Sequence, residues 1–153
     1  MKTFFSKLAV SILLVFSFMN VNAQTKRNLK QEASNKKIVV EFYQKLFGDK
    51  DVSVIDTYLV EDYIQHNPGV ADGRKALKDG VTQWFAGAPK EKINIQHVAA
   101  DGDLVFIHLK SKGANGKTIS VIDIFRLKNS KIVEHWDVIQ EVPEKAANNH
   151  PMF

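Results

Sequence analysis

The sequence predicts an α+β fold in which N-terminal helices cover one face of a curved, mainly antiparallel sheet. Two observations carry this prediction. Up to about residue 86 the apolar residues recur at helical spacing, whereas from Lys92 onward they recur with a period of two. The second region also contains hairpin signals, of which Asp101-Gly102 is the strongest. Helices followed by a run of strands are typical of this fold class.

Residues 1–23 are predicted to be a secretory signal peptide. Lys2 and Lys7 give a basic start, and the apolar run over 8–19 is shorter than the ~20 residues that span a bilayer. Val21-Asn22-Ala23 then provides small residues for cleavage before Gln24. We therefore expect a secreted or periplasmic protein that has no membrane association once the signal is removed.

The remaining chain is predicted to form a single domain. We divide it into a loose lead-in at 24–34, the folded domain at 35–143 and a C-terminal tail at 144–153. Cysteine is absent, so the core must stabilise the exported chain without disulfides. The formal net charge of +4, to which the two signal lysines contribute, is too small to indicate a nucleic-acid-binding surface.

Three helices are predicted, each from an apolar stripe bounded by capping residues. They are a helix from about Ser34 to Phe47 that Gly48 ends, a short helix that begins at Asp51 or Ser53, and a helix from Gly73 to about Phe85 that Asp72 caps. Between the second and third lies Tyr63-Ile64-Gln65-His66-Asn67-Pro68. The Pro68-Gly69 pair forces a turn, so Tyr63 and His66 precede a rigid corner.

Four strands are predicted to follow, at 93–100, 103–112, 118–127 and 132–139. One carboxylate, Asp123, stands in the middle of the third. Burying a charge without a partner is costly, so Asp123 is paired, protonated or turned to water. A carboxylate held in an apolar pocket takes up protons more readily and suits the role of a general base.

The strand register decides which side chains share a face with Asp123. If the loop Gly113–Gly116 pairs Lys112 with Lys117, then Phe106 lies opposite Asp123. We expect the helices and a cavity on this face, because it gathers titratable groups among aromatic residues. Its predicted members are Ile95, His97, Leu104, Phe106, His108, Val121, Asp123 and Phe125. The opposite face is also apolar, and we expect it to form a homodimer interface.

The face of the last strand stays open at the sequence level. A two-residue turn at Asn129-Ser130 sets Asp123 opposite Trp136, whereas a three-residue loop sets it opposite His135. A slip of one residue exchanges the pair Glu134 and Trp136 for the pair His135 and Asp137 on the pocket side.

These motifs resemble those of the SnoaL-like branch of the nuclear transport factor 2-like superfamily. The resemblance rests on Asp123-Ile124-Phe125-Arg126, on Lys131-Ile132-Val133-Glu134-His135-Trp136-Asp137 after the turn, and on Tyr63 to Pro68. It covers about 35–143. It implies a cone-like fold whose helices and curved sheet enclose a pocket, often in a dimer, and chemistry without cofactor or metal.

The reaction that typifies the resembled branch is ring closure by intramolecular aldol condensation. The resemblance places the acid/base aspartate on Asp123 and a pocket histidine on His108. Our hypothesis is that Asp123 is the general base, with His108 or His66 as proton donor or relay, acting on a small apolar carbonyl compound. The predicted ligand-binding residues are Tyr63, Trp84, Phe106, Phe125, His135, Trp136 and Asp137.

Each candidate also has a purely structural interpretation. Asp123 can be bonded to a neighbouring side chain, His66 can be an ordinary loop residue, and His108 can be a satisfied core histidine. An exported ligand-binding module without chemistry is therefore the alternative function, and a dimer with a filled cavity is a third. No short metal-ligand spacing, phosphate-binding loop or dinucleotide fingerprint occurs, so we expect neither metal nor nucleotide cofactor.

Overall fold

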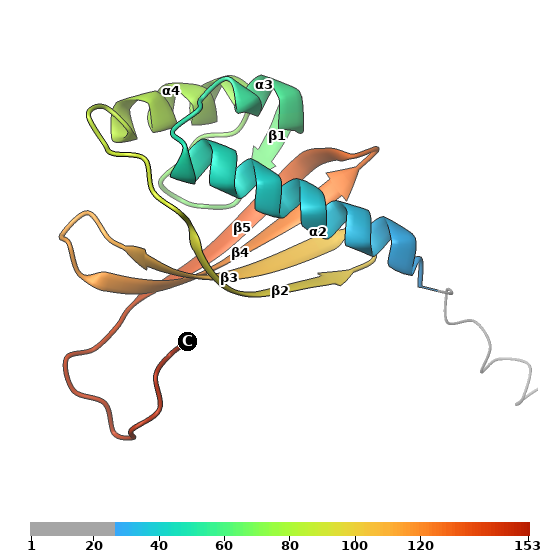
Figure 1. Cartoon of the computed structure of the whole chain (residues 1–153). Helices are drawn as coiled ribbons and strands as arrows, with labels where there is room; N and C mark the ends of the chain where they lie inside the picture. Colours follow the sequence, from blue (N-terminus) through green and yellow to red (C-terminus); the bar gives the residue numbers. More distant parts are fainter. Residues whose placement is uncertain (1–26) are drawn as a thin grey trace, which may run out of the picture.

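The computed structural model describes residues 27–153, so the predicted signal peptide lies outside the described residues. Helices α2 (Leu29–Tyr43), α3 (Val54–Tyr58) and α4 (Arg74–Trp84) pack on one face of a five-stranded sheet (Figure 1). The strands are β1 (Leu59–Gln65), β2 (Asn94–Asp101), β3 (Leu104–Lys112), β4 (Thr118–Lys128) and β5 (Lys131–Glu141). Within 27–153, no helix combines the length and apolar character that crossing a bilayer requires.

Helix α2 begins at Leu29 rather than at the predicted Ser34. Its N-cap is Asn28, whose side-chain oxygen accepts a hydrogen bond from the Gln31 backbone N–H at 3.0 Å. Glu32 is polar but buried, and its carboxylate accepts the Gly102 backbone N–H at 3.2 Å. The prediction of a loose lead-in is therefore wrong for residues 29–34, because buried polar groups concealed the helical stripe.

The last turn of this helix widens into a π-helix, η2 (Gln44–Gly48). Gly48 is the predicted end, and a Cβ at this position would lie 2.7 Å from the Glu91 carbonyl oxygen. The helix can therefore end against the segment before β2 only because Gly48 has no side chain.

The sheet order is β1-β5-β4-β3-β2, with β1 parallel to β5 and every other pair antiparallel. The prediction of a mainly antiparallel sheet is confirmed, but β1 was not predicted. Strand β1 is an edge strand whose register with β5 is broken between Leu59 and Ile64, and Glu61 and Asp62 face solvent. The alternation of apolar and polar residues in β1 is therefore too weak to predict a strand from the sequence.

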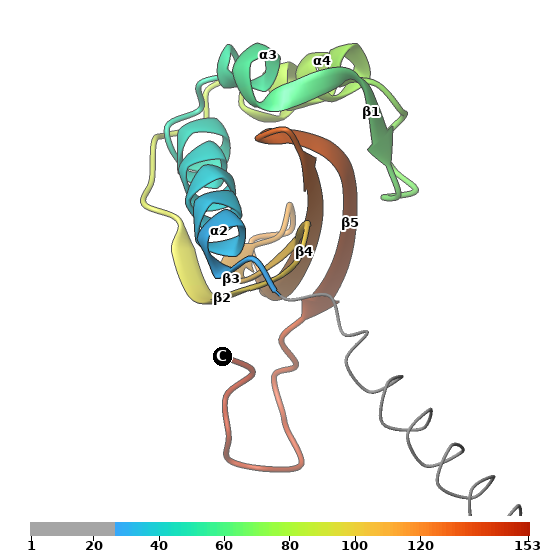
Figure 2. The same ribbon diagram turned by 90° about the vertical axis from the view of Figure 1, so that its right-hand side faces the viewer.

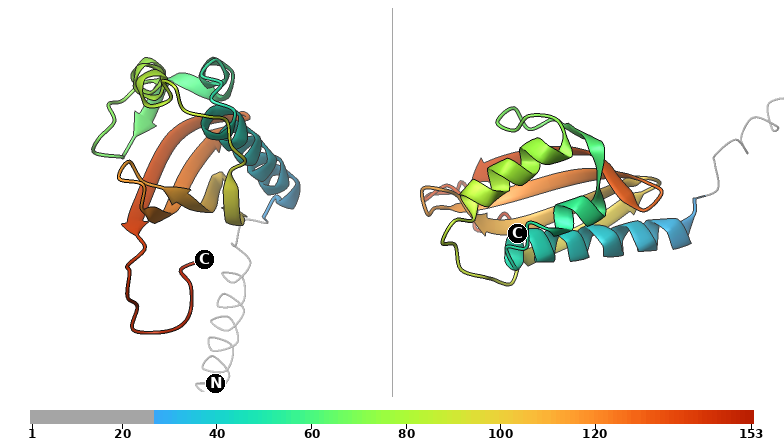
Figure 3. Two further views of the ribbon diagram at one scale, coloured as in Figure 1. Left: turned by 60° about the vertical axis from the view of Figure 1, so that its left-hand side comes forward. Right: turned by 90° about the horizontal axis from the view of Figure 1, so that it is seen from above.

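The sheet curls so that β4 and β5 bend toward the helices (Figure 2). Viewed from above, α2 and α4 both lie over the sheet (Figure 3). The core between the layers contains apolar side chains from α2, η2, α4 and the inner face of the sheet, among them Val39, Phe42, Leu46, Val81, Val105, Ile107, Leu109 and Ile132.

The predicted register of β3 is wrong by one residue. Lys112 pairs with Thr118, so five residues rather than four form the loop, and Ile107 lies opposite Asp123. Because neighbouring side chains of a strand point to opposite faces, this slip turns Phe106 and His108 to the outer face. A bulge between Ile95 and His97 in β2 turns His97 outward as well, where it pairs with His108.

The β4–β5 hairpin has the predicted two-residue turn at Asn129-Ser130, since Lys128 pairs with Lys131. The register then shifts between Arg126 and Leu127, so that Asp123 lies opposite Asp137. The shift amounts to one extra residue in β5. It brings His135 and Asp137 to the inner face, which settles the face that the sequence left open.

After β5 the tail crosses to the side of the sheet that faces away from the helices (Figure 1). Its last residue, Phe153, stacks on the His108 ring with a centroid separation of 5.8 Å, and the Lys110 ammonium lies 4.8 Å from the Phe153 ring centroid. The end of the tail therefore lies against the outer face of the sheet.

Candidate functional site

A cavity of about 870 Å³ lies between the helices and the inner face of the sheet. Aromatic and aliphatic side chains form much of its wall, and a small group of polar side chains lies at its inner end. Its lining includes Phe42, Tyr43, Phe47, Tyr63, Gln65, Asn67, Trp84, Val121, Asp123, Phe125, His135, Asp137 and Ile139. An apolar wall with few convergent polar groups is typical of a small-molecule site.

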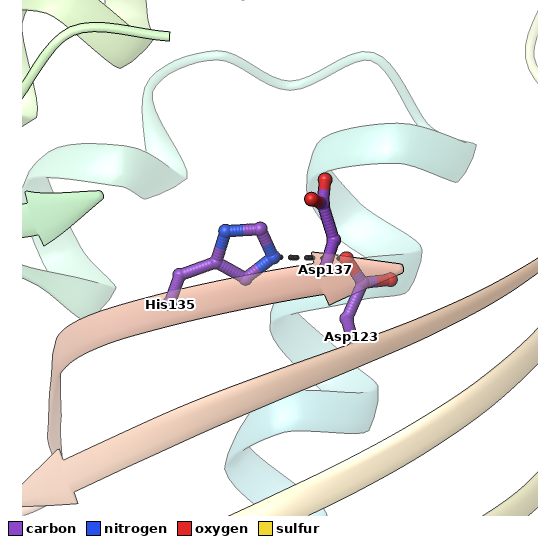
Figure 4. A group of neighbouring side chains, drawn as sticks. All are labelled: Asp123, His135 and Asp137. Carbon is purple, nitrogen blue, oxygen red and sulfur yellow. Dashed lines mark hydrogen bonds and ion pairs between the residues drawn. The ribbon is translucent and has the colours of Figure 1, made fainter. Parts of the chain in front are cut away.

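The polar group is centred on Asp123 of β4 and His135 of β5. Nε2 of His135 lies 2.9 Å from Oδ1 of Asp123, and the two residues are 8% and 5% exposed. Figure 4 shows both side chains rising from adjacent strands on the same side of the sheet, with Asp137 beside them. The adjacent register of β4 and β5 therefore assembles an acid–imidazole pair inside the cavity.

Tyr43 reaches the same carboxylate from helix α2. Its hydroxyl donates a hydrogen bond to Oδ2 of Asp123 at 3.0 Å. Burial raises the pKa of Tyr43 well above the ordinary value, and the negative charge of Asp123 raises it further. The phenol therefore keeps its proton and acts as a donor, so both oxygens of Asp123 have a partner.

The corner after β1 supports the β5 residues from the other side. Nδ1 of His135 lies 2.8 Å from Oε1 of Gln65, which also accepts the backbone N–H of Asn67 at 3.0 Å. The Asn67 side-chain amide donates to Oδ2 of Asp137 at 2.5 Å. The segment before Pro68 thus holds the imidazole and the second carboxylate in place.

Tyr63 completes this arrangement from the middle of β1. Its hydroxyl accepts a hydrogen bond from Nε2 of Gln65 at 3.3 Å. Burial, followed by the charges of Asp123 and Asp137, raises the pKa of Tyr63 well above its ordinary range. Tyr63 is therefore a neutral hydroxyl beside two carboxylates, able to donate its own hydrogen into the cavity.

Asp123, His135 and Asp137 are also the residues that could hold a metal ion. One ligand atom from each lies within 4.8 Å of the others. Carboxylate oxygen and imidazole nitrogen suit divalent transition metals. In the described geometry Nε2 of His135 and Oδ1 of Asp123 lie 2.9 Å apart, which is hydrogen-bond distance.

Six of the predicted site residues line the cavity. They are Tyr63, Trp84, Phe125, His135, Asp137 and Asp123. Trp84 is 54% exposed and also lines a neighbouring cavity of about 680 Å³, so it lies at the mouth. The structure places these side chains where a ligand would meet them; their roles stay predictions.

The other four predicted site residues, His66, His108, Phe106 and Trp136, lie on the outer face, so they cannot contact a ligand in this cavity. The slip in β3 moved two of them, as described above. Trp136 pairs with Ile124 on the outer face, and the His66 ring stacks on it at a centroid separation of 4.6 Å. Nε2 of His108 contacts Ser120 Oγ at 2.8 Å. The prediction of His108 or His66 as the donor beside Asp123 is therefore wrong.

Three residues of the network were not predicted as site residues: Tyr43, Gln65 and Asn67. Tyr43 was read as part of the apolar stripe of the first helix, since an aromatic residue at that spacing is typical of a core. Gln65 and Asn67 belong to the motif before Pro68, which drew attention to His66 instead. Gln65 and His66 point to opposite faces of the edge strand, so recognising β1 would have separated them.

The sequence profile of the SnoaL-like polyketide cyclase family matches residues 37–147. No curated protein sequence matches the chain. The matched range contains the corner after β1, helix α4 and the entire β4–β5 hairpin, and it includes every residue of the polar network described above.

Solved structures share the fold. A candidate SnoaL-like polyketide cyclase from Jannaschia sp. CCS1 has a TM-score of 0.60 at 17% identity, covering 76% of this chain and 91% of its own. An epoxide hydrolase of the LEH-like type from M. tuberculosis has 0.59 at 17%, covering 72% and 85%. A candidate ketosteroid isomerase from Kribbella flavida has 0.60 at 12%, covering 76% and 85%. These similarities confirm the α+β cone-like fold, and at such identities they show the fold alone.

Proposed function

Because the chain belongs to the SnoaL-like polyketide cyclase family, we propose that it is an acid–base enzyme acting on a small, mainly apolar carbonyl compound. The reaction class is proton abstraction next to the carbonyl, followed by condensation, ring closure or isomerisation, with Asp123 as the base. The observation that carries the proposal is the buried Asp123–His135 pair at the inner end of a cavity of about 870 Å³.

The proposed first step forms an enolate. The Asp123 carboxylate takes a proton from the carbon next to the carbonyl; the C–H bond breaks, an O–H bond forms, and the electron pair moves onto the carbonyl oxygen. Each carboxylate oxygen still has a lone pair beyond the one that accepts from Tyr43 or faces His135. General base catalysis of this kind typically contributes 10²–10⁴-fold.

The enolate oxygen needs a hydrogen-bond donor that is aimed before the reaction begins. Tyr63 is the best-placed donor among the described residues, because it lines the cavity and stays protonated. The enolate carbon can then attack a second carbonyl group, which forms a C–C bond and leaves an alkoxide that takes the proton from Asp123. Alternatively, a conjugated enolate takes that proton back at another carbon. Condensation and isomerisation thus share the first step and differ in the substrate.

The test needs no knowledge of the natural substrate. A panel of apolar ketones is incubated with the protein in D₂O, and NMR follows the replacement of hydrogens next to the carbonyl by deuterium. We expect exchange with at least one ketone and a loss of about 10²-fold or more in Asp123→Asn. Asp62→Asn, an exposed aspartate on the same sheet, is the matched control and should exchange like the parent.

Two outcomes would contradict the proposal. If Asp137→Asn abolished exchange and Asp123→Asn did not, the base would be the wrong carboxylate. If no ketone exchanged but ligands bound and still bound Asp123→Asn, the chain would be a ligand-binding module without chemistry. The observation that favours this second function is that both Asp123 oxygens already have partners.

Export and self-association are further parts of the proposal. A signal over residues 1–23 would deliver the protein to the periplasm or the medium. The outer face exposes Ile122 by 42% and Val138 by 66%, which supports a homodimer through this face. Native mass spectrometry should give a dimer for the parent and a monomer for Val138→Glu. A monomeric parent would contradict the proposed homodimer.

A further inference from the structure

We propose that the neighbouring cavity of about 680 Å³ is a second part of the substrate site and that it binds a carboxylate. The substrate is then a linear, mainly apolar carbonyl compound with a carboxylate at the end remote from the carbonyl group. This inference names a substrate class for the proposed function and rests on that function. It assigns a role to lysines that the proposed reaction does not use.

The two cavities adjoin each other through a shared wall. The residues that line both are Tyr43, Phe47, Trp84, Ser111 and Lys112. The Phe47 ring lies 4.6 Å from the Tyr43 ring and 5.8 Å from the Phe85 ring, measured between centroids. Aromatic side chains therefore continue from the first cavity into the second, and an apolar chain can lie along them.

The two cavities differ in charge. Three acidic residues and one lysine line the first cavity: Asp123, Asp137, Glu141 and Lys112. Four lysines and one acidic residue line the second: Lys50, Lys92, Lys110, Lys112 and Glu91. A cleft lined by charges of one sign concentrates ligands of the opposite sign. An anionic group is thus repelled from the inner end of the first cavity and attracted to the second, which fixes the direction of the ligand.

Two of the four lysines are already engaged. The Lys50 ammonium pairs with Glu91 at 3.0 Å and donates to the Phe47 carbonyl oxygen at 2.5 Å. The Lys110 ammonium lies 4.8 Å from the ring centroid of Phe153, on the outer face of the sheet. Neither lysine is therefore assigned to the carboxylate.

The other two lysines, Lys92 and Lys112, have no acidic partner. Lys112 donates to the neutral Thr118 hydroxyl at 3.0 Å, and its side chain is exposed. Lys92 is exposed as well, and within residues 27–153 it pairs with no carboxylate, since the neighbouring Glu91 binds Lys50. Lysine ammonium groups on flexible stems can turn toward an incoming anion. The structure assigns Lys92 and Lys112 as the carboxylate-binding residues.

The length of the ligand follows from the sheet. Thr118 lines the second cavity and pairs with Lys112 across β3 and β4. It lies five residues before Asp123 on β4, which corresponds to about 17 Å along an extended strand. A lysine side chain covers part of this span, and the rest requires several methylene groups between the carbonyl group and the carboxylate. A compact keto acid is too short to meet both Asp123 and the lysines.

The experiment compares a long straight-chain methyl ketone that ends in a carboxylate with its methyl ester. Deuterium exchange next to the ketone gives KM for each compound. In the parent at low salt, KM of the acid should be about fivefold lower than that of the ester, because two exposed ion pairs form. The difference should shrink as salt is added. Levulinate and its methyl ester, the short pair, should have equal KM values.

The variant combines Lys92→Gln with Lys112→Gln and should bring the ratio of the two KM values for the long pair to about one. The matched control combines Lys37→Gln with Lys128→Gln, two exposed lysines outside both cavities. It removes the same charge and should keep the parent ratio. Equal KM values for the long pair in the parent would overturn the inference. So would a preference for the acid that survives in the variant, or one that the control loses equally.

Calorimetric binding of the same compounds separates this inference from the proposed function. If the acid bound about fivefold more tightly than the ester but no ketone exchanged, the proposed reaction would fail and the carboxylate site would stand. If ketones exchanged but acid and ester did not differ in KM or affinity, the reaction would stand and the carboxylate site would fail.

Discussion

The two faces of the β4–β5 hairpin carry the same contact in two environments. On the inner face His135 meets Asp123, and on the outer face His66 meets Glu134, each with 2.9 Å between nitrogen and oxygen. The inner side chains are 10% and 7% exposed, whereas the outer ones are 42% and 19% exposed. The distance between nitrogen and oxygen therefore does not distinguish the two pairs, but their exposure to solvent does.

The partners of the two pairs differ as well. Glu134 also accepts the Arg126 guanidinium at 2.8 Å, and Arg126 pairs with Asp103 in turn. Apart from the bond between them, Asp123 and His135 form side-chain hydrogen bonds only with the neutral groups of Tyr43 and Gln65 among the described residues, although the Asp137 carboxylate lies nearby. The outer pair is one member of a solvated charge network, whereas the inner pair depends on its own two members. This dependence makes the inner pair both a stability risk and a suitable acid–base centre.

The largest expected effect comes from removing the histidine of each pair. His135→Leu leaves a buried carboxylate without its charge partner, and we expect a loss of about 3–5 kcal/mol in the free energy of unfolding. His66→Leu leaves Glu134 with Arg126 and water, and we expect about 0–1 kcal/mol. Urea denaturation of the two variants measures both values.

A double variant separates charge from packing. Adding Asp123→Asn to His135→Leu removes the stranded charge, so part of the lost stability should return. If His135→Leu cost no more than His66→Leu, burial would not distinguish the pairs and the comparison would fail.

An intermediate effect is expected from removing the Tyr43 hydroxyl. The outer pair has no equivalent donor. Tyr43→Phe removes a donor from buried Asp123 and should cost about 1–3 kcal/mol in the free energy of unfolding. Tyr58→Phe is the matched control: the Tyr58 hydroxyl accepts from Lys45 at 3.3 Å in a half-buried place, and its loss should stay within about 0.5 kcal/mol. Equal costs would mean that Tyr43 contributes packing alone.

The same two faces show how much of the structure could be predicted from the sequence. Asp123 and Phe125 were placed correctly on the pocket face. Strand β4 itself has no extra residue, because the extra residue of the β4–β5 pairing lies in β5. The side chains of β3 were placed on the wrong face, because a loop that is one residue longer shifts the register and exchanges the two faces of the strand. Loop length and bulges depend on tertiary fit rather than on local pattern, so the fold class was predictable where the strand faces were not.

The site itself was predictable in its acid and only partly in its partners. The sequence points to Asp123 because a lone carboxylate in an apolar strand is unusual. It does not point to Gln65 or Tyr43, because neutral side chains become functional only through the group that they contact. Gln65 meets His135 only when β1 is laid parallel to β5, a pairing between distant segments that no local pattern announces.

The smallest expected effect is the contribution of the outer pair to stability as the pH falls. The hydrogen bond from His66, followed by the contact with Arg126, holds the pKa of Glu134 below its ordinary value of 4.5. A carboxyl group whose pKa is lowered by folding stabilises the protein above its unfolded-state pKa, and this contribution disappears as the pH falls through the folded-state value. Glu134→Gln should therefore cost at most about 1 kcal/mol at neutral pH and nothing once the pH is well below 4.5.

Urea denaturation of the parent and of Glu134→Gln, from neutral pH down to about pH 3, measures this difference. Glu41→Gln serves as the control, because Glu41 of α2 pairs with Lys45 of η2 and its pKa is lowered without contact to either hairpin face. The ketone exchange rate at neutral pH should be the same in parent and Glu134→Gln. A variant that lost exchange activity along with the acid-sensitive stability would show that the outer pair acts on the inner one through the sheet, and the two faces could no longer be treated as independent.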